Sequence, residues 1–499
     1  MKIRSVKLSN FIHQLQMRNS TAPFFLAIIL PPLFVFASFA QAADPERPNI
    51  VLVLVDDMGW MDLSCQGSDY FQTPRIDQLA KEGMRFTDAY AACAVCSPTR
   101  AAVMTGRWPS RLGVTDWIRA RFQRGGIGTP KRNPTEYVGG PKRKLLCPPN
   151  PFWLEHAETT AAELLKPLGY ATCHVGKWHL GDPAWYPTAQ GFDRNVAGCD
   201  IGQPPSYFDP YEHPRYGFDG QLTARTKGEF LSHREADECR QFILAHQDQP
   251  FFLYYCPYAV HTPIQAIPEV AAKYKRADKR DVNAKYAAMV ESVDDAVGTI
   301  LDTLQEAELD DNTLVIFTSD NGGLKGPTDN TPLRSGKGYA YEGGIRVPLI
   351  IRWPNVVQPG TISSEVVTSV DYWPTIAEAT GQPIPDSIDG LSLVEHLRSN
   401  GTKSLDREAV HWHFPHYRHA PGPYSIIRAG DWKLIRWYEG GHELYNLRSD
   451  LSEQNELSGK HPDIVTRLDN MLTVELQRAG AKLPRANAGY APTPTPTEN

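Results

Sequence analysis

Two pairs of polar residues in this chain combine side chains that bind hard metal ions. Asp56 and Asp57 directly follow one apolar run, and Asp320 lies with Asn321 just after a second. We expect both runs to be buried strands, and open α/β sheets bind ligands at the carboxyl ends of their strands. Oxygen donors without sulfur or imidazole suit Ca²⁺ or Mg²⁺. Either pair alone is also common in turns and helix caps, so the prediction depends on both following strands.

Cationic and imidazole side chains follow the expected ends of other strands. Lys177 and His179 lie in the sequence G-K-W-H-L-G, and residues i and i+2 of an extended segment point the same way. His261 precedes a proline turn, and Lys337 lies in a glycine-flanked loop. Taken one at a time, these residues are also typical of solvated loops and structural turns.

A cysteine motif connects these residues to one chemistry. Cys96 begins the sequence C-S-P-T-R, and T-G-R follows at residues 105–107. With Cys93 it also forms a C-x-x-C, which occurs in redox pairs, zinc sites and local disulfides, but no second such pair completes a zinc set. The stretch resembles the signature of the formylglycine-dependent type I sulfatases of the alkaline phosphatase superfamily. The other motifs follow in that family's order over residues 47–480, and the chain looks most similar to the arylsulfatase A and N-acetylgalactosamine sulfatase branch.

The resemblance implies two cofactors. In the family, a maturing enzyme oxidises the motif cysteine to Cα-formylglycine, and the hydrated aldehyde attacks the sulfur of a sulfate ester. This implies that Cys96 is the modified residue and that a formylglycine-generating enzyme is a partner of the chain. One Ca²⁺ per chain is implied as well. The implied metal ligands are Asp56, Asp57, Cys96, Asp320 and Asn321.

The same resemblance implies a role for each remaining motif residue. Arg100 would orient the formylglycine, and Lys177 and Lys337 would bind the sulfate. His179 would form a hydrogen bond with the formylglycine. His261 would protonate the departing alcohol oxygen, a task that suits imidazole near neutral pH.

The sequence therefore predicts a sulfuric ester hydrolase that acts on sulfated carbohydrates, such as polysaccharide or glycosaminoglycan fragments. Two alternatives stay open. One is a formylglycine-dependent phosphodiester or phosphonate hydrolase, and the other is a non-catalytic protein that binds sulfated glycans. The motifs specify neither the sugar, nor the sulfate position, nor the oligomeric state.

Several loops are candidates for contacts with the sugar. One is the segment at residues 200–211, and another carries His411, His413, His416 and Arg418. The three histidines can equally form one exposed face of a strand. A separate insertion at residues 117–151 is rich in Gly, Pro, Lys and Arg. We interpret this insertion as solvated surface, with a basic lip for a polyanionic sugar as the alternative.

Short apolar runs that alternate with helical segments predict an α/β fold. The resemblance implies an alkaline-phosphatase-like large domain with a mixed, mostly parallel sheet flanked by helices, and a smaller domain with an antiparallel sheet and a helix. The clearest helix is expected at residues 282–307, where apolar residues keep a 3.6-residue period. Strands are expected at 49–55, 171–175, 251–255, 314–318 and 347–351, with a short helix at 159–166. The small domain is expected to hold strands at 409–414, 424–428, 432–438 and 443–445 and a helix at 462–479.

The first 43 residues read as a secretory signal. Four basic residues precede an apolar run at 24–39, and A-Q-A at 40–42 is a small-residue cleavage site. A membrane anchor is the alternative, although the run is short and contains two prolines. The expected domains are then the catalytic one at 44–405, the C-terminal one at 406–485 and a disordered tail at 486–499.

Export sets the expected surroundings of the chain. Loss of the signal removes four positive charges and takes the net charge from −6 to −10, which argues against a nucleic-acid partner. We expect a periplasmic or secreted protein without a stable membrane anchor. Eight cysteines could form disulfides there, but their scattered spacing is not that of a disulfide framework. Cys173 and Cys256 lie in or beside apolar runs and are expected to be buried free thiols.

Overall fold

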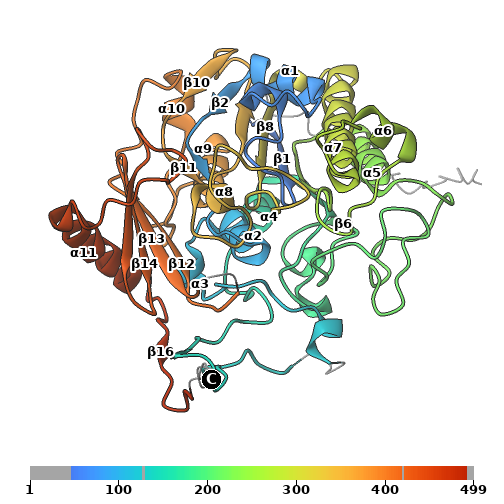
Figure 1. The fold of residues 1–499 in the computed structure, drawn as a ribbon. Coiled ribbons are helices and arrows are strands. Elements are labelled where there is room, and N and C mark those ends of the chain that lie inside the picture. Colours follow the sequence, from blue (N-terminus) through green and yellow to red (C-terminus); the bar gives the residue numbers. More distant parts are fainter. Residues whose placement is uncertain (1–46, 126–129, 419–420, 492–499) are drawn as a thin grey trace, which may run out of the picture. The chain divides into compact units, whose positions relative to one another are not determined.

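An eight-stranded mixed sheet forms the centre of the protein (Figure 1). The computed structural model describes residues 47–125, 130–418 and 421–491. The strand order is β10-β2-β9-β8-β1-β7-β5-β6, and β9 alone pairs antiparallel, with both β8 and β2. The strands are β1 (Asn49–Val55), β2 (Met84–Phe86), β5 (Ala171–Gly176), β6 (Arg194–Val196), β7 (Phe251–Cys256), β8 (Thr313–Ser319), β9 (Leu349–Arg352) and β10 (Thr361–Ser363). The predicted strands and the mostly parallel sheet are confirmed.

The parallel strands bring their carboxyl ends to one edge of the sheet. β1 lies between β7 and β8, parallel to both. Val55 at the end of β1 pairs with Ser319 at the end of β8, and Gly176 of β5 pairs with Cys256 of β7. The polar residues that follow these strands therefore start from neighbouring points.

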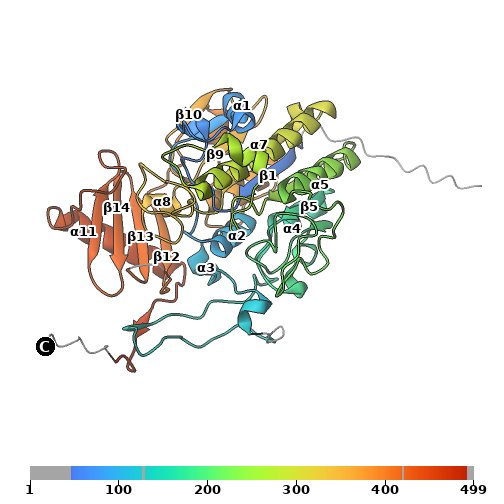
Figure 2. The same cartoon turned by 45° about the vertical axis from the view of Figure 1, so that its right-hand side comes forward.

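Helices cover both faces of this sheet (Figures 1 and 2). One core contains Val51, Val53 and Val55 of β1, and alternate residues of the same strand point into a second core on the opposite face. The first core is covered by α1 (Pro74–Glu82), α5 (Leu231–Ala245) and α7 (Asp281–Glu306). The second is covered by α2 (Cys96–Thr105), α4 (Ala161–Leu165), α9 (Tyr372–Ala379) and α10 (Val394–Arg398). The long helix expected at 282–307 is thus confirmed as α7.

A separate four-stranded antiparallel sheet follows towards the C-terminus, as predicted. Its strands are β12 (Val410–Phe414), β13 (Tyr424–Ala429), β14 (Trp432–Trp437) and β15 (His442–Asn446), and its helix is α11 (Pro462–Arg478). One face packs against α11 through Leu468, Leu472 and Leu476. The other face packs, through Trp412 and its neighbours, on the segment that leads into α2. The described residues form one compact unit, so the boundary expected at residue 405 stays a prediction.

The smaller elements connect these parts. They are β3 (Ala89–Tyr90), β4 (Leu145–Leu146), β11 (Val367–Thr368), β16 (Arg485–Ala486), α3 (Pro109–Leu112), α6 (Pro268–Lys273) and α8 (Glu342–Ile345). β4 pairs with β16, so that the start of the predicted tail lies against the insertion at 117–151. The predicted signal at residues 1–43 and the tail beyond residue 491 lie outside the described residues.

The three histidines near β12 correct a prediction. His411, His413 and His416 are 3%, 4% and 7% exposed, so the interpretation as an exposed strand face is wrong. His411 and His416 form hydrogen bonds with the hydroxyls of Ser110 and Thr115, and His413 with that of Ser425. A contact of this segment with the sugar stays a prediction. Alternation along the strand indicated that they share a face but not what covers that face.

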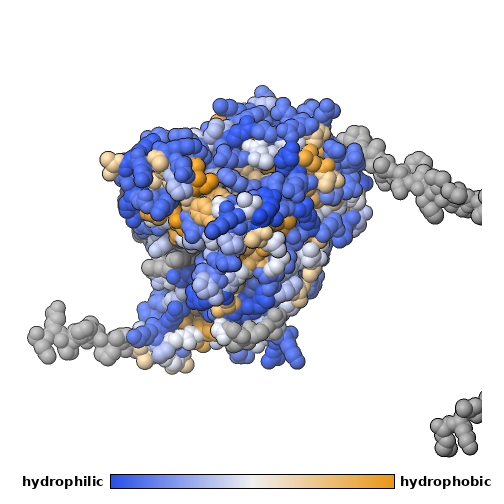
Figure 3. Space-filling model, turned by 90° about the vertical axis from the view of Figure 1, so that its right-hand side faces the viewer, coloured by the Kyte–Doolittle hydropathy of each residue, from blue (hydrophilic) through white to orange (hydrophobic). Residues whose placement is uncertain are grey.

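The described cysteines are all free thiols, and Cys173 and Cys256 are fully buried as expected. A search of the helices within residues 47–491, apart from the two short gaps, finds none that could cross a bilayer. On the face drawn in Figure 3, hydrophilic residues predominate and the apolar ones lie in small groups.

Buried ion pairs join the C-terminal sheet to the central part. Lys433 of β14 lies 2.9 Å from Glu342 at the start of α8 and 2.8 Å from Glu453, and the side chain of Lys433 is 1% exposed. Glu342 also accepts a hydrogen bond from Arg346 at 3.0 Å. Removing one partner of such a group leaves an uncompensated buried charge, which is strongly unfavourable.

We therefore expect Lys433→Met to lower the free energy of unfolding by about 3 kcal/mol, measured by urea denaturation. The control is Lys460→Met, which removes an exposed lysine. Equal stability of the two variants would contradict a structural role for this ion-pair group.

Candidate active site

The two polar pairs predicted from the sequence meet at the carboxyl edge of the sheet. The backbone N–H of Asp57 donates to Asp320 Oδ1 at 3.2 Å, and Asn321 Nδ2 donates to Asp57 Oδ1 at 2.9 Å. Asp56 and the other three residues are at most 1% exposed. The structure thus places three carboxylates and one amide together without access to bulk water.

Three cations surround these carboxylates. Lys177 Nζ lies 2.7 Å from Asp56, and Lys337 Nζ lies 2.6 Å from Asp57. Arg100 pairs with Asp320 at 2.7 Å. Lys337 is thus not the solvated loop residue that its glycine-flanked sequence alone would also fit, since its side chain is only 15% exposed.

Close contacts between backbone segments position the two lysines at the site. At Gly176 a Cβ would lie 2.0 Å from the Cys256 carbonyl, so only glycine lets the chain turn here with φ +97°. Lys177 follows directly, and its N–H donates to the same carbonyl at 2.7 Å. The N–H of Lys337 donates to the carbonyl of Gly323, just beyond Asn321, at 3.0 Å.

Burial and mutual repulsion shift the pKa values of the carboxyl groups. Burial, together with the charges of Asp320 and Asp57, raises the pKa of Asp56 to about 8, although Lys177 opposes this shift. Burial acts on Asp57 too, but the Lys337 ammonium holds the pKa of that carboxyl below its ordinary value. Like charges this close ionise together only when positive charge balances them.

Cys96 is the first residue of α2 and points towards this cluster. Its Sγ lies 3.4 Å from Lys337 Nζ, and a sulfur or oxygen at a helix N-terminus is favourably placed to carry negative charge. Burial nevertheless raises the pKa of the Cys96 thiol to about 11, against the charges of Lys177 and Lys337. The unmodified thiol is therefore neutral at physiological pH and a weak nucleophile.

The rest of the cysteine motif fixes this position. The Ser97 hydroxyl donates to the carbonyl of His179 at 2.9 Å and accepts from the N–H of Ile118 at 2.9 Å. Thr99 Oγ1 lies 3.1 Å from both the N–H and the carbonyl of Cys93. A threonine fits this position, since Thr99 is fully buried and its hydroxyl has hydrogen-bond partners.

Backbone carbonyls hold both predicted histidines. His179 Nε2 donates to the carbonyl of Ile118 at 2.8 Å, and the buried Nδ1 has no partner among the described residues. His261 Nδ1 donates to the carbonyl of Thr262 at 2.8 Å, which leaves Nε2 3.6 Å from Asp57 Oδ2. Burial, with the charge of Lys337, lowers the pKa of His261 to about 3, so its ring is neutral at pH 7.

The donor set fits a hard cation. Ligand atoms of Asp56, Asp57, Cys96 and His261 all lie within 4.8 Å of one another. Asn321 adds a buried Oδ1 without a hydrogen-bond partner in the described chain. Several carboxylate oxygens and an unpaired amide oxygen are the ligands that Ca²⁺ and Mg²⁺ prefer.

All ten predicted site residues therefore come together. A further residue, Tyr207, supports them but was not identified from the sequence. The Tyr207 hydroxyl lies 2.6 Å from the carbonyl of Tyr258 and 2.8 Å from that of His261, at the start and end of the loop that holds this histidine. Tyr207 is fully buried. No motif marked it, although it lies within the segment at 200–211 that we expected to contact sugar.

Comparisons with known proteins agree with this geometry. The family model "Sulfatase" matches residues 48–382, and the model "N-sulphoglucosamine sulphohydrolase, C-terminal" matches residues 335–481. The chain belongs to the sulfatase family. It is an enzyme, a sulfuric ester hydrolase, and its fold is that of the alkaline phosphatase superfamily, as the sequence predicted.

Individual relatives cover nearly the whole chain. The sulfatase is 34% identical to N-acetylgalactosamine-6-sulfatase of Mus musculus, over 89% of this chain and 82% of the relative. It is 31% identical to arylsulfatase A of Homo sapiens, over 90% of this chain and 91% of that protein. Among solved structures, Ps i-CgsB in complex with k-i-k-neocarrahexaose matches with a TM-score of 0.73 and 29% identity, over 86% of this chain and 93% of that one.

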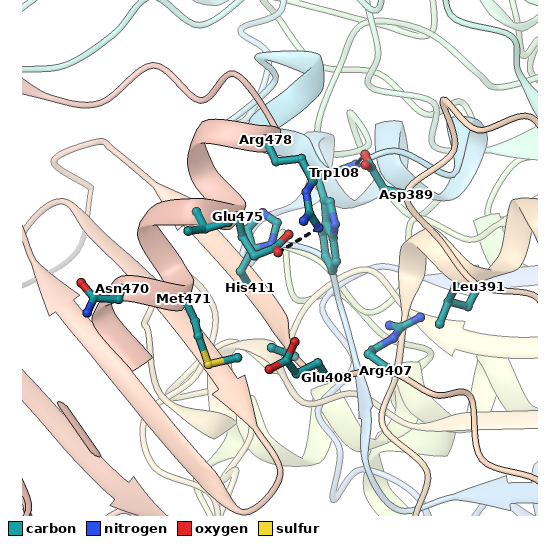
Figure 4. A pocket seen from close by; sticks show the side chains of 12 residues that line it. Trp108, Asp389, Leu391, Arg407, Glu408, His411, Asn470, Met471, Glu475 and Arg478 are labelled. Atoms are coloured by element: carbon teal, nitrogen blue, oxygen red, sulfur yellow. Dashed lines mark hydrogen bonds and ion pairs between the residues drawn. The ribbon is translucent and has the colours of Figure 1, made fainter. Parts of the chain in front are cut away.

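A cavity of about 460 Å³ elsewhere in the sulfatase is not part of this site (Figure 4). It lies between α11 and the segment before β12, with Glu475 and Arg478 on one side and Arg407 and Glu408 on the other. None of the ten residues described above lines it. This cavity is therefore separate from the predicted site residues at the sheet edge.

We expect Tyr207→Phe to lower kcat for sulfate-ester hydrolysis about tenfold, because the loop that holds His261 beside Asp57 loses its hydrogen bond. The matched control is Tyr170→Phe, which removes a buried hydrogen bond to the Pro48 carbonyl at the opposite end of the sheet. Steady-state kinetics of both variants would decide, and equal kcat values would show that Tyr207 does not position the loop.

Proposed function

We propose that this sulfatase hydrolyses sulfate esters of carbohydrates, with Cys96 in its formylglycine form as the nucleophilic residue. The observation that carries the proposal is the position of Cys96 within the group of acidic, cationic and imidazole side chains at the sheet edge. The names of its relatives support a sugar substrate, since they include an N-acetylgalactosamine-6-sulfatase and a protein solved with a carrahexaose.

Modification of Cys96 accounts for the chemistry of its surroundings. A formylglycine hydrate supplies an oxygen nucleophile that can release sulfate by returning to the aldehyde. The thiol itself is a weak nucleophile here, as its raised pKa indicates. A formylglycine-generating enzyme is accordingly a proposed partner. The signal-like residues 1–43 support export to the periplasm or beyond.

A Ca²⁺ ion is the second proposed cofactor. When bound, it neutralises negative charge on the sulfate and on its protein ligands. Its proposed ligands are Asp56, Asp57, residue 96, Asp320 and Asn321.

The chain's own cations would bind the sulfate group. Lys177 and Lys337 each direct an ammonium group to the carboxylates beside Cys96, so a sulfate placed there meets two positive charges. Arg100 holds Asp320 and donates to the carbonyl of Lys177 at 2.7 Å, and thereby fixes one of these lysines. Preorganised charges of this kind stabilise negative charge that develops as the S–O bond breaks.

His261 is the proposed acid for the leaving alcohol. Its Nδ1 is held by the Thr262 carbonyl, so that Nε2 is the atom that can carry the transferable proton. The ring is neutral in the substrate-free protein, and the charge of a bound sulfate favours its protonated form, because a nearby anion raises the pKa of imidazole. His179 offers its unpaired Nδ1 to a hydroxyl of the modified residue 96.

The direct test is sulfate and phosphate release from a panel of sulfated galactosides, glycosaminoglycan oligosaccharides, an aryl sulfate and an aryl phosphate. The enzyme is co-expressed with a formylglycine-generating enzyme. We expect sulfate release from one or a few sugar isomers, and a loss of at least about 1,000-fold in Cys96→Ala, since the nucleophile is removed.

Two results would contradict the proposal. Faster release of phosphate than of sulfate would favour a phosphorus ester hydrolase. If no ester released sulfate or phosphate while the same sugars were still bound, a glycan-binding protein would be favoured.

Metal dependence gives a second prediction. Removal of divalent ions by a chelator should lower the thermal midpoint, and Ca²⁺ at about 100 times its Kd should restore roughly 2.7 kcal/mol of stability. Asp320→Asn should reduce this response, while Asp311→Asn, which changes an exposed aspartate before β8, should keep it. An equal Ca²⁺ response in both variants, measured by calorimetry, would place the ion elsewhere.

A further inference from the structure

The insertion after α3 forms an extended arm that the proposed reaction does not use. Residues 130–150 run out from the central part and return, and the C-terminal segment 482–491 lies along them (Figures 1 and 2). β4 and β16 pair antiparallel, and Val138 pairs with Cys147 across the arm. The N–H of Ala491 donates to the Pro141 carbonyl at 2.7 Å. We call these two segments together the basic arm.

Positive charge concentrates on the basic arm. Its two segments hold seven basic residues and one acidic residue, Glu136, in a chain whose net charge is −6. All seven basic side chains belong to exposed residues. They are Lys131, Arg132, Lys142, Arg143, Lys144, Lys482 and Arg485.

Most of this charge is not neutralised within the described chain. Lys144 lies 3.7 Å from Glu439, the one ion pair that involves these seven residues among the described ones. Arg143 lies over the ring of Tyr417 at 4.7 Å, and Arg485 over that of Tyr137 at 4.0 Å. A surface with this excess of one sign attracts a ligand of the opposite sign.

Contacts of neighbouring residues link the arm to the active site. The carbonyl of Ile118, earlier in the same insertion, accepts the hydrogen bond from His179. The next residue back, Trp117, lies under the guanidinium of Arg418 at 4.4 Å. Tyr417, adjacent to Arg418, accepts a hydrogen bond at its hydroxyl from the N–H of Leu145 in the arm at 3.1 Å. Arg418, which pairs with Asp116 at 3.3 Å, thus lies between the neighbourhood of His179 and the arm.

We propose that the basic arm binds the anionic chain of a sulfated polysaccharide, beyond the sugar whose sulfate is removed. This inference rests on the proposed function, which supplies a sulfated glycan as substrate. The arm then draws a polymeric substrate to a catalytic chain that is otherwise negatively charged. It favours polymers over single sugars, because only a polymer reaches both the site and the arm.

The arm suits a glycan better than other polyanions. Single-stranded nucleic acids stack successive bases on several open aromatic rings. The rings of Tyr137 and Tyr417 are each covered by an arginine, which leaves Tyr490, 37% exposed, as an open ring of the arm. Anionic membranes are bound by amphipathic helices with a wide apolar face, whereas the arm consists of loops and two short strands, with Val138 as its most exposed large apolar side chain.

The test replaces three arm cations that have no ion-pair partner in the described chain. The arm variant is Lys131→Ala with Arg132→Ala and Lys142→Ala. The matched control is Lys81→Ala with Lys275→Ala and Lys460→Ala, three exposed lysines outside the arm that give the same change in net charge. Neither variant touches the catalytic residues or a buried contact.

We expect the arm variant to lose at least about tenfold in kcat/KM for the sulfated polysaccharide at low salt, since each cation beside a dense anionic surface contributes about a factor of five. Its kcat/KM for the matching sulfated monosaccharide should stay within about twofold, and the difference between arm variant and wild type should shrink as salt screens the charges. An equal loss in the control, or no loss with the polysaccharide, would overturn the inference.

Direct binding separates this inference from the proposed function. Wild type and both variants are titrated with dextran sulfate, uncharged dextran, single-stranded DNA and anionic phospholipid vesicles. Weaker binding of dextran sulfate by the arm variant alone supports the arm as a glycan site, even if no ester is hydrolysed. Arm-dependent binding of DNA or vesicles, without such dependence for dextran sulfate, would assign the arm to another polyanion.

Discussion

The structure depends on the balance of charge at one buried edge of the sheet. Three carboxylates lie there within reach of one another, and burial with mutual repulsion raises the pKa of Asp56 to about 8. Buried charges are tolerated only when they are paired. Each carboxylate therefore has its own cation, from Lys177, Lys337 or Arg100. Because the two lysines also act on Cys96, the same balance that allows burial prepares a site for an anion.

The remainder of the fold serves to bring these charges together. The carboxylates follow β1 and β8, one lysine follows β5, and the arginine comes from α2, so that the site exists only when the parallel strands are in register. The second sheet then holds α2 in place from outside. Trp412 of β12 donates to the carbonyl of Ala91 at 2.7 Å, a few residues before Cys96. This explains why a sheet with none of the ten predicted site residues packs on the segment that leads to Cys96, the proposed nucleophilic residue.

Sequence could predict the strands and their polar ends, because buried parallel strands are short apolar runs and their ends are marked by a change to polar residues. It could not predict the backbone at those ends. Asp57 and His179 adopt left-handed conformations, with φ +62° and +60°, that no local pattern specifies for these residue types. The burial of Lys337 and the contact of Tyr207 with the His261 loop depend on chain segments far apart in sequence. Such contacts follow from the tertiary fold, and only the resemblance to a family indicated that Lys337 belonged to the site.

We propose above all that the sheet edge binds a hard cation beside residue 96. A crystal structure of the mature enzyme grown with Ca²⁺, with anomalous scattering to identify the ion, tests it most directly. We expect one ion with oxygens of Asp56, Asp57, Asp320 and Asn321 at about 2.3–2.6 Å. The ammonium groups of the two lysines should then turn from the aspartates towards a bound anion. A structure at saturating Ca²⁺ in which both lysines still pair with the aspartates, and no ion is bound, would contradict this proposal.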